Sequence, residues 1–149
     1  MMRRLDEKDI AAILAIENES FSSPYNEQQY VFELEDNPCS YLFGYEEKGE
    51  LKGFIDFWIT FESCQLTKIA VAKQARGKHI SLELMDFMID FAMEKGCETI
   101  FLEVRESNEV AKNLYESYDF IEINRRQNYY PDNHETAIVM GKAIGGLGE

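Results

Sequence analysis

The chain lacks the features that typify a membrane, secreted or metal-binding protein. Its 149 residues include only three cysteines, Cys39, Cys64 and Cys97, an odd number that forms no metal-type pair. No apolar run approaches the length that spans a bilayer. The N-terminal MMRRLDEKDI has two arginines with no apolar segment behind them, so we expect no signal peptide. These absences predict a reduced, cytoplasmic setting without structural disulfides.

Basic residues are also scarce, and the net charge is -13. This balance argues against a nucleic-acid partner, because nucleic-acid binders usually present a basic face. An acidic surface could steer a cationic substrate or partner inward. It could equally serve only to keep the protein soluble. The charge alone does not decide between these two interpretations.

What the sequence does contain indicates one folded domain. Hydrophobic residues make up 45% of the chain, enough for a core, and we find no repeat or linker. We expect a single domain over residues 1–142 and a flexible tail at 143–149. Period-two and helical patterns predict the order β-α-α-β-β-β-α-β-α-β-β. The fold class is therefore α/β, a mixed sheet of about seven strands with four helices on its faces.

The expected elements follow from the same patterns. Strands are predicted at 2–5, 41–47, 51–61, 64–71, 98–104, 120–130 and 136–143. The first helix carries Ile10 to Ile16, capped by Asp6 or Asp9, and the second runs from a cap at Asn26 to before Pro38. The remaining helices are predicted at 78–95 and 108–118.

Acidic residues are missing from Ser63 to Leu82, where a strand leads into a helix. The first turn of a helix leaves backbone N–H groups unpaired and carries positive partial charge. Gly77 allows a close backbone approach, and Arg76 and Lys78 add full charges. These features predict that the loop binds a diphosphate. An ordinary exposed basic loop would have the same residues. Its spacing matches neither the Walker loop nor the dinucleotide fingerprint.

One carboxylate is expected inside a strand. Alternation over 98–104 puts Glu103 on the face opposite Leu102. A strand between two helices should be central and covered on both faces, where a carboxylate must be paired or used. Glu103 is thus either a structural ion-pair partner or a general base. Tyr115, on the buried side of the next helix, is either core or a hydroxyl presented to the same site.

These residues resemble a known family. The stretch IAV…QARGKHISLELM…IFLEVRESNEVAKNLYESYDF is similar to the GCN5-related N-acetyltransferases, and the resemblance covers nearly the whole chain. The segments IENESFSSPYNEQQYVFEL and RRQNYYPDNHETAIVM resemble the branch that acetylates protein N-termini. The resemblance implies acetyl-CoA as co-substrate, no metal, and the GNAT fold, in which the strand of Ile69–Val71 splays from the strand of Glu103. It also implies an acceptor, the N-terminal alanine of a basic ribosomal protein, small-subunit protein eighteen.

The resemblance further implies a role for individual residues. Glu103 matches the general base, acting through water, and Tyr115 the general acid that protonates the departing thiolate. Tyr25, Tyr129 and Tyr130 match the acceptor side, although the last two could be edge packing. The cofactor arm should pair with the splayed strand and its diphosphate should lie on the loop. The implied cofactor-binding residues are Ile69, Ala70, Val71, Arg76, Gly77, Lys78, His79, Ile80, Ser81, Leu82 and Asn108.

Three positions depart from the family pattern. His79 stands where glycine or alanine is usual, Asp119 where a glycine precedes the phenylalanine, and Tyr25 where tryptophan is common. Aspartate tolerates a left-handed backbone better than most residues. Two alternatives stay open, namely an acetyltransferase for a small amine or lysine side chain, and a non-catalytic acetyl-CoA-binding module. The NYYP segment favours a peptide acceptor, and intact Glu103 and Tyr115 argue against the module.

Overall fold

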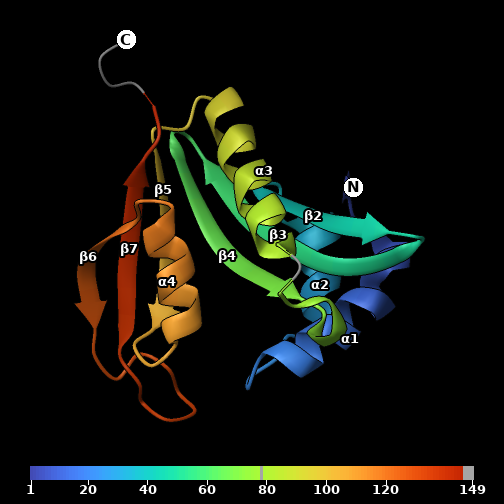
Figure 1. The fold of residues 1–149 in the computed structure, drawn as a ribbon, viewed down its shortest axis with the longest axis horizontal. Helices are drawn as coiled ribbons and strands as arrows, with labels where there is room; N and C mark the ends of the chain where they lie inside the picture. Colours follow the sequence, from blue (N-terminus) through green and yellow to red (C-terminus); the bar gives the residue numbers. More distant parts are fainter. Residues whose placement is uncertain (78, 146–149) are drawn as a thin grey trace.

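The computed structural model describes residues 1–77 and 79–145, and within them it contains seven strands and four α-helices (Figure 1). The strands are β1 (Met2–Arg4), β2 (Ser40–Glu47), β3 (Glu50–Thr60), β4 (Ser63–Val71), β5 (Thr99–Arg105), β6 (Ile121–Arg126) and β7 (Ala137–Ala143). The helices are α1 (Ile10–Ser20), α2 (Glu27–Val31), α3 (Ile80–Glu94) and α4 (Glu109–Ser117). Shorter helical segments are η1 (Glu7–Asp9), the π-helical η2 (Phe32–Asp36) and η3 (Lys73–Ala75).

The strands form one mixed sheet in the order β1-β2-β3-β4-β5-β7-β6. Neighbouring strands are antiparallel except β4 and β5, which run parallel and are connected by α3. The predicted fold class and order of elements are confirmed. A crossover helix between two parallel strands packs back onto the sheet, which places the start of α3 beside the end of β4.

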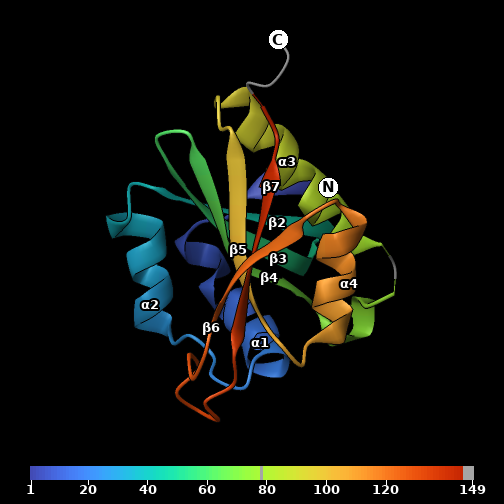
Figure 2. The same cartoon turned by 90° about the vertical axis from the view of Figure 1, so that its left-hand side faces the viewer.

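The helices cover the two faces of the sheet unequally (Figures 1 and 2). On one face α3 and α4 pack over the centre of the sheet, where Leu84 and Met88 join the cluster of Ile100 and Leu102. On the other face α1 and α2 cover β2 to β4, and their core includes Tyr30. Among the described residues no helix covers this second face at β5, β7 and β6 (Figure 2).

The expectation that the Glu103 strand is covered on both faces is therefore wrong. Burial alternates along β5, with Ile100, Leu102 and Val104 buried and the residues between them half-buried. The physical reason is that α1 and α2 precede β2 and stay over the strands next to it. Glu103 consequently has access to solvent.

Strands β4 and β5 separate halfway along their length. They pair from Ser63 with Thr99 to Leu66 with Leu102 and no further. At this point Thr67 is an extra residue in the pairing of β4 with β3, and its Oγ1 donates to the carbonyl of Asp56 at 2.8 Å. Such a bulge bends the strand that carries it. The predicted splay is thus confirmed, and the bulge turns the end of β4 away from β5.

Several element boundaries differ from the prediction. Strand β6 ends at Arg126, not at residue 130, because the following loop contains left-handed residues at Asn128 (φ 54°) and His134 (φ 60°). Asp6 caps η1, whereas Asp9 makes no cap hydrogen bond to α1. The predicted cap of α2 at Asn26 is confirmed, and Asn26 and Gln29 exchange hydrogen bonds there.

The C-terminal part of β7 is tied to the sheet. The strand ends at Ala143, and the N–H of Ile144 donates to the carbonyl of Glu98 at 2.9 Å. Residues 146–149 of the predicted tail lie outside the described residues. In the part of the chain that the structure describes, no helix is both long and apolar enough to cross a membrane. The same residues contain no group of three side chains placed to hold a metal ion.

Two buried carboxyl groups face each other where β3 meets η2. Asp56 is fully buried, and burial, followed by the neighbouring Glu33, raises its pKa well above the ordinary value of 3.8. The hydroxyl of Ser40 donates to Asp56 Oδ1 at 3.0 Å. One proton is therefore retained on Asp56 in the folded protein while Glu33 carries the charge.

We expect this retained proton to make stability depend on pH. The folded state binds it more tightly than the unfolded state, so the contribution of Asp56 to stability falls as pH rises above about 4, through the raised pKa. Asp56→Asn keeps the shape of the protonated form and should lose this fall. Urea unfolding at pH 5 and pH 8 should show a smaller loss of stability in the variant than in the parent protein, and equal losses would contradict the assignment.

Candidate active site

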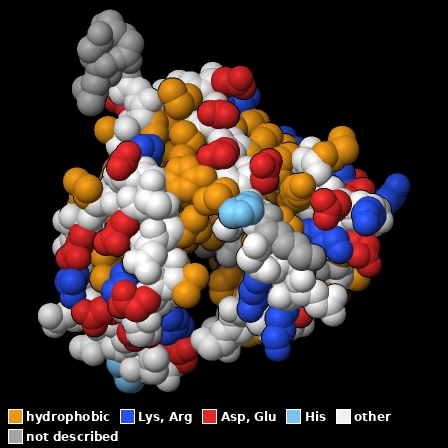
Figure 3. Space-filling view, in the orientation of Figure 1, with side chains coloured by type: hydrophobic (Ala, Val, Ile, Leu, Met, Phe, Trp, Pro, Cys, Tyr) orange, Lys and Arg blue, Asp and Glu red, His pale blue; other side chains and the backbone are white. Residues whose placement is uncertain are grey.

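The splay leaves one edge of β4 without a neighbouring strand. Ile69, Ala70 and Val71 pair with β3 on one side only, so half of their backbone groups point into the gap toward β5. An extended ligand with amide groups can bind such an edge as an added strand does. Figure 3 shows apolar side chains lining the hollow between the diverging ends of β4 and β5. Contact of these three residues with the amide-containing arm of coenzyme A stays a prediction, and the free edge of β4 is compatible with it.

The loop after β4 opens into the N-terminus of α3. Gly77 has φ of +81°, and a Cβ there would meet no atom within 4 Å, so the conformation and not the space requires glycine. His79 precedes the helix and makes no side-chain cap hydrogen bond. The first-turn N–H groups of α3, at Ile80, Ser81 and Leu82, therefore have no side-chain cap and suit an anion. The predicted Lys78 lies outside the described residues.

His79 and Asp119 both adopt the left-handed conformation, with φ of 64° and 68°. Glycine takes this conformation at the lowest cost, which explains in physical terms why it is usual at both positions. Asp119 behaves as predicted, and whether the His79 side chain contacts a phosphate stays a prediction.

Two other predicted cofactor residues make structural contacts. Arg76 turns back on β4, donating from Nε to the carbonyl of Val71 at 3.1 Å and from Nη2 to Ser20 Oγ at 3.2 Å. Asn108 caps α4, accepting the N–H of Ala111 at 3.1 Å. These bonds hold the loop and the helix in place beside the gap. Direct contact of either side chain with the cofactor stays a prediction.

Glu103 lies on β5, the strand across the gap from the free edge of β4, and its side chain is on the uncovered face of the sheet. Its Oε1 accepts a hydrogen bond from the Tyr129 hydroxyl at 2.9 Å, and its Oε2 lies 3.3 Å from Arg126 Nε. The side chain is 22% exposed. A held carboxylate that reaches water can take a proton directly or through one water molecule. Glu103 is thus an ion-pair partner, and this is compatible with its predicted role as a general base because a paired carboxylate can also accept a proton.

Tyr130 lies within electrostatic range of this carboxylate, and Tyr115 lies within electrostatic range of Tyr130. Burial raises the pKa of Tyr130 to about 12, and the charge of Glu103 adds to the effect. Burial, and then Tyr130, raise the pKa of Tyr115 above its ordinary value. Both hydroxyls therefore keep their protons at neutral pH and can act as donors. Tyr115 belongs to the core cluster in its packing, and its role as the general acid stays a prediction.

The loop between β6 and β7 is clamped across the end of β5 by Arg105, whose role sequence reasoning missed. Its guanidinium makes two hydrogen bonds to Asp132, at 3.1 and 3.0 Å, and stacks 3.9 Å from the centre of the Tyr130 ring. Asp132 also accepts a bond from Ser22, in the loop after α1, at 3.1 Å. Two loops far apart in sequence thereby meet beside the splay.

Tyr25 is fixed on β4 by a buried ion pair that sequence reasoning also missed. Glu17 of α1 is fully buried, pairs with Lys68, and accepts the N–H of Tyr25 at 2.8 Å. The hydroxyl of Tyr30 donates to the same carboxylate. The ammonium of Lys68 lies 3.8 Å from the centre of the Tyr25 ring. The half-buried Tyr25 is therefore held by its backbone and its ring together.

Breaking this pair should destabilise the fold. Lys68→Met leaves the buried Glu17 without its cation, and removing one partner of a buried pair typically costs about 3 kcal/mol. We expect urea unfolding at pH 7 to show a loss of that size. Glu50 is exposed and pairs with Lys52, so Lys52→Met is the matched control and should change stability by less than about 1 kcal/mol. A loss no larger than that of the control would contradict the assignment.

Comparisons with known proteins agree with this arrangement. Residues 10–120 match the profile of the Acetyltransferase (GNAT) family. A Bacillus subtilis protein, provisionally named a ribosomal protein bS18-alanine N-acetyltransferase, is 33% identical over 143 residues, 96% of this chain and 95% of its own length. The Escherichia coli K12 enzyme of that name is 32% identical over 142 residues, 94% of this chain and 95% of its own. The crystal structure of the Escherichia coli ribosomal-protein-S18-alanine N-acetyltransferase superposes with a TM-score of 0.91 at 29% identity, covering 100% of this chain and 96% of that one.

Proposed function

Because this chain belongs to the GNAT family of acetyl-CoA-dependent N-acetyltransferases, we propose that its acceptor is the α-amino group of a protein N-terminus. The specific acceptor that we propose is the N-terminal alanine of ribosomal protein bS18, for which the relatives are named. The reaction would take place in the cytoplasm, where ribosomal proteins are made.

Each proposed residue has one task in this reaction. An α-amino group has a pKa of about 8, so a fair minority is neutral at pH 7. As the amine nitrogen bonds to the thioester carbonyl carbon, Glu103 takes its proton through water. As the carbon–sulfur bond breaks, Tyr115 gives a proton to the thiolate. No covalent enzyme intermediate is needed, and holding amine and thioester in line supplies much of the acceleration.

The observation that carries the proposal is the position of Glu103. It lies on β5, across the gap from the free edge of β4, under a loop that contributes the hydroxyl of Tyr129. An acceptor entering from the open face of β5 would meet this carboxylate, while the cofactor approaches along β4. The two substrates would therefore meet in the gap from opposite sides of the sheet.

An acceptor panel tests the proposal. The protein is incubated with acetyl-CoA and either N-terminal peptides, lysine-containing peptides with blocked N-termini, or polyamines, and free thiol is measured. We expect turnover with alanine-terminated peptides. Turnover only with polyamines or blocked peptides would overturn the proposed acceptor. Binding of acetyl-CoA with no turnover on any amine would favour the non-catalytic module.

A further inference from the structure

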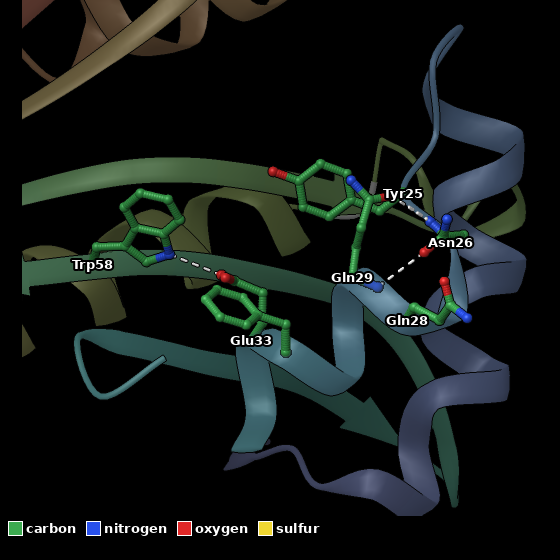
Figure 4. Close-up of a pocket in the computed structure, with 7 residues that line it drawn as sticks. Tyr25, Asn26, Gln28, Gln29, Glu33 and Trp58 are labelled. Atoms are coloured by element: carbon green, nitrogen blue, oxygen red, sulfur yellow. Dashed lines mark hydrogen bonds between the residues drawn. The ribbon is translucent and has the colours of Figure 1, made fainter. Parts of the chain in front are cut away.

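A second hollow, of about 330 Å³, lies between α2, η2 and β3 (Figure 4). Three aromatic rings and one carboxylate contribute to its lining. Phe32 keeps 50% of its surface exposed. The lining residues are Tyr25, Asn26, Gln28, Gln29, Phe32, Glu33 and Trp58.

The carboxylate in this hollow is a buried charge. Glu33 is only 5% exposed, and its Oε1 accepts the indole N–H of Trp58 at 2.8 Å while Oε2 accepts Asn37 Nδ2 at 3.0 Å. Burial acts to raise the pKa of Glu33, but the neighbouring Asp56 and then the hydrogen bond from Trp58 outweigh it and leave the pKa below its ordinary value. The negative charge therefore stays on Glu33 at neutral pH.

This charge has no cationic partner among the described residues. Among the ion pairs between described residues, none includes Glu33. A buried charge is costly unless it is paired, and its hydrogen bonds come from neutral groups. The rings of Phe32 and Trp58 attract cations in the same space, whereas Tyr25 already has the Lys68 ammonium 3.8 Å from its ring centre. The hollow thus has the chemistry of a cation site with an acidic floor and aromatic walls.

We propose that this hollow binds a basic side chain, arginine or lysine, that follows the acetylated N-terminus of the acceptor protein. The inference rests on the proposed function and adds a sequence preference to it. A protein of net charge -13 would also attract such an acceptor from a distance.

The open sheet face connects the hollow to the active site. Trp58 pairs with Gln65, and Gln65 pairs with Phe101, so their side chains share one face with Glu103. Glu103 lies two strands away from Trp58 across the sheet and two residues further along it. The distance between their backbones is therefore roughly 12 Å. An extended peptide covers that distance in about four residues. Gln65, which lies between Trp58 and Phe101 on this face, is exposed.

Matched peptides test the inference. Three pairs of alanine-terminated peptides carry either arginine or glutamine at position 2, 3 or 4 and are otherwise identical. We expect kcat/KM to favour arginine about tenfold at one of these positions, the scale of a desolvated cation on aromatic rings. Glu33→Gln should reduce that preference to about twofold, because the floor loses its charge.

Two further variants serve as the control and as an independent test of the hollow. Glu35→Gln removes the same charge from the exposed side of η2 and should retain the preference. Phe32→Ala removes an exposed ring without opening the core and should reduce the preference, so the test does not depend on the fold of Glu33→Gln alone. Equal kcat/KM for arginine and glutamine at all three positions, or a preference that survives Glu33→Gln, would overturn the inference while leaving the proposed function intact. A protein that acetylates none of these peptides would overturn both.

Discussion

Replacing Glu103 with glutamine is expected to lower kcat about a thousandfold, within the usual range for the loss of a general base, while leaving acetyl-CoA affinity nearly unchanged. The carboxylate lies on β5, across the gap from the edge of β4 that would hold the cofactor. Glutamine keeps an oxygen to accept the Tyr129 hydroxyl and so preserves the geometry. The loss should be largest at low pH, where most of the acceptor amine is protonated.

The control for this variant is Glu106→Gln, which removes one charge just beyond β5. Glu106 pairs with Arg125 on the surface, and its side chain is 48% exposed. We expect its kcat to stay near that of the parent protein. Stopped-flow or thiol-release kinetics with one peptide at several pH values give both numbers. Normal turnover by Glu103→Gln would assign Glu103 a purely structural role.

Replacing Tyr115 with phenylalanine is expected to lower kcat about a thousandfold as well, because the departing thiolate loses its proton donor. The hydroxyl of Tyr115 makes no hydrogen bond within the described residues, and phenylalanine fills the same space in the core. Thermal stability should therefore change by no more than a few degrees. The chemical step is isolated by single-turnover kinetics with the enzyme in excess.

Tyr118→Phe is the matched control, since Tyr118 ends the same helix and donates its hydroxyl to Asp86 Oδ1 at 2.8 Å and to the carbonyl of Leu82 at 3.2 Å, both on α3. It should lose some stability and keep its turnover. A Tyr115→Phe protein that is folded and fully active would remove Tyr115 from the reaction. One that unfolds would return Tyr115 to the core.

Much of the fold could be predicted because it follows from local periodicity. The alternation in β5 and the apolar stripe of α3 each lie in one continuous segment. The predicted bounds of both elements agree with the structure to within about two residues. The uncovered face of β5 could not be predicted, because it depends on which strands α1 and α2 cover. The early end of β6 depends on left-handed residues such as Asn128, which periodicity does not reveal.

The candidate site divides in the same way. Glu103 was predicted because a carboxylate in an apolar strand is visible in the sequence, and the family resemblance supplied its role. Arg105, Lys68 and Glu33 were missed as site residues because their partners lie 27, 51 and 25 residues away. A charged residue shows its type in the sequence but not its partner.

The acceptor atom is the most direct test of the central claim. The protein is given acetyl-CoA and one peptide that carries both a free N-terminal alanine and an internal lysine, and tandem mass spectrometry locates the acetyl group. We predict a single acetyl group on the α-nitrogen of the alanine. Acetylation of the lysine side chain with the N-terminus left free would contradict the account.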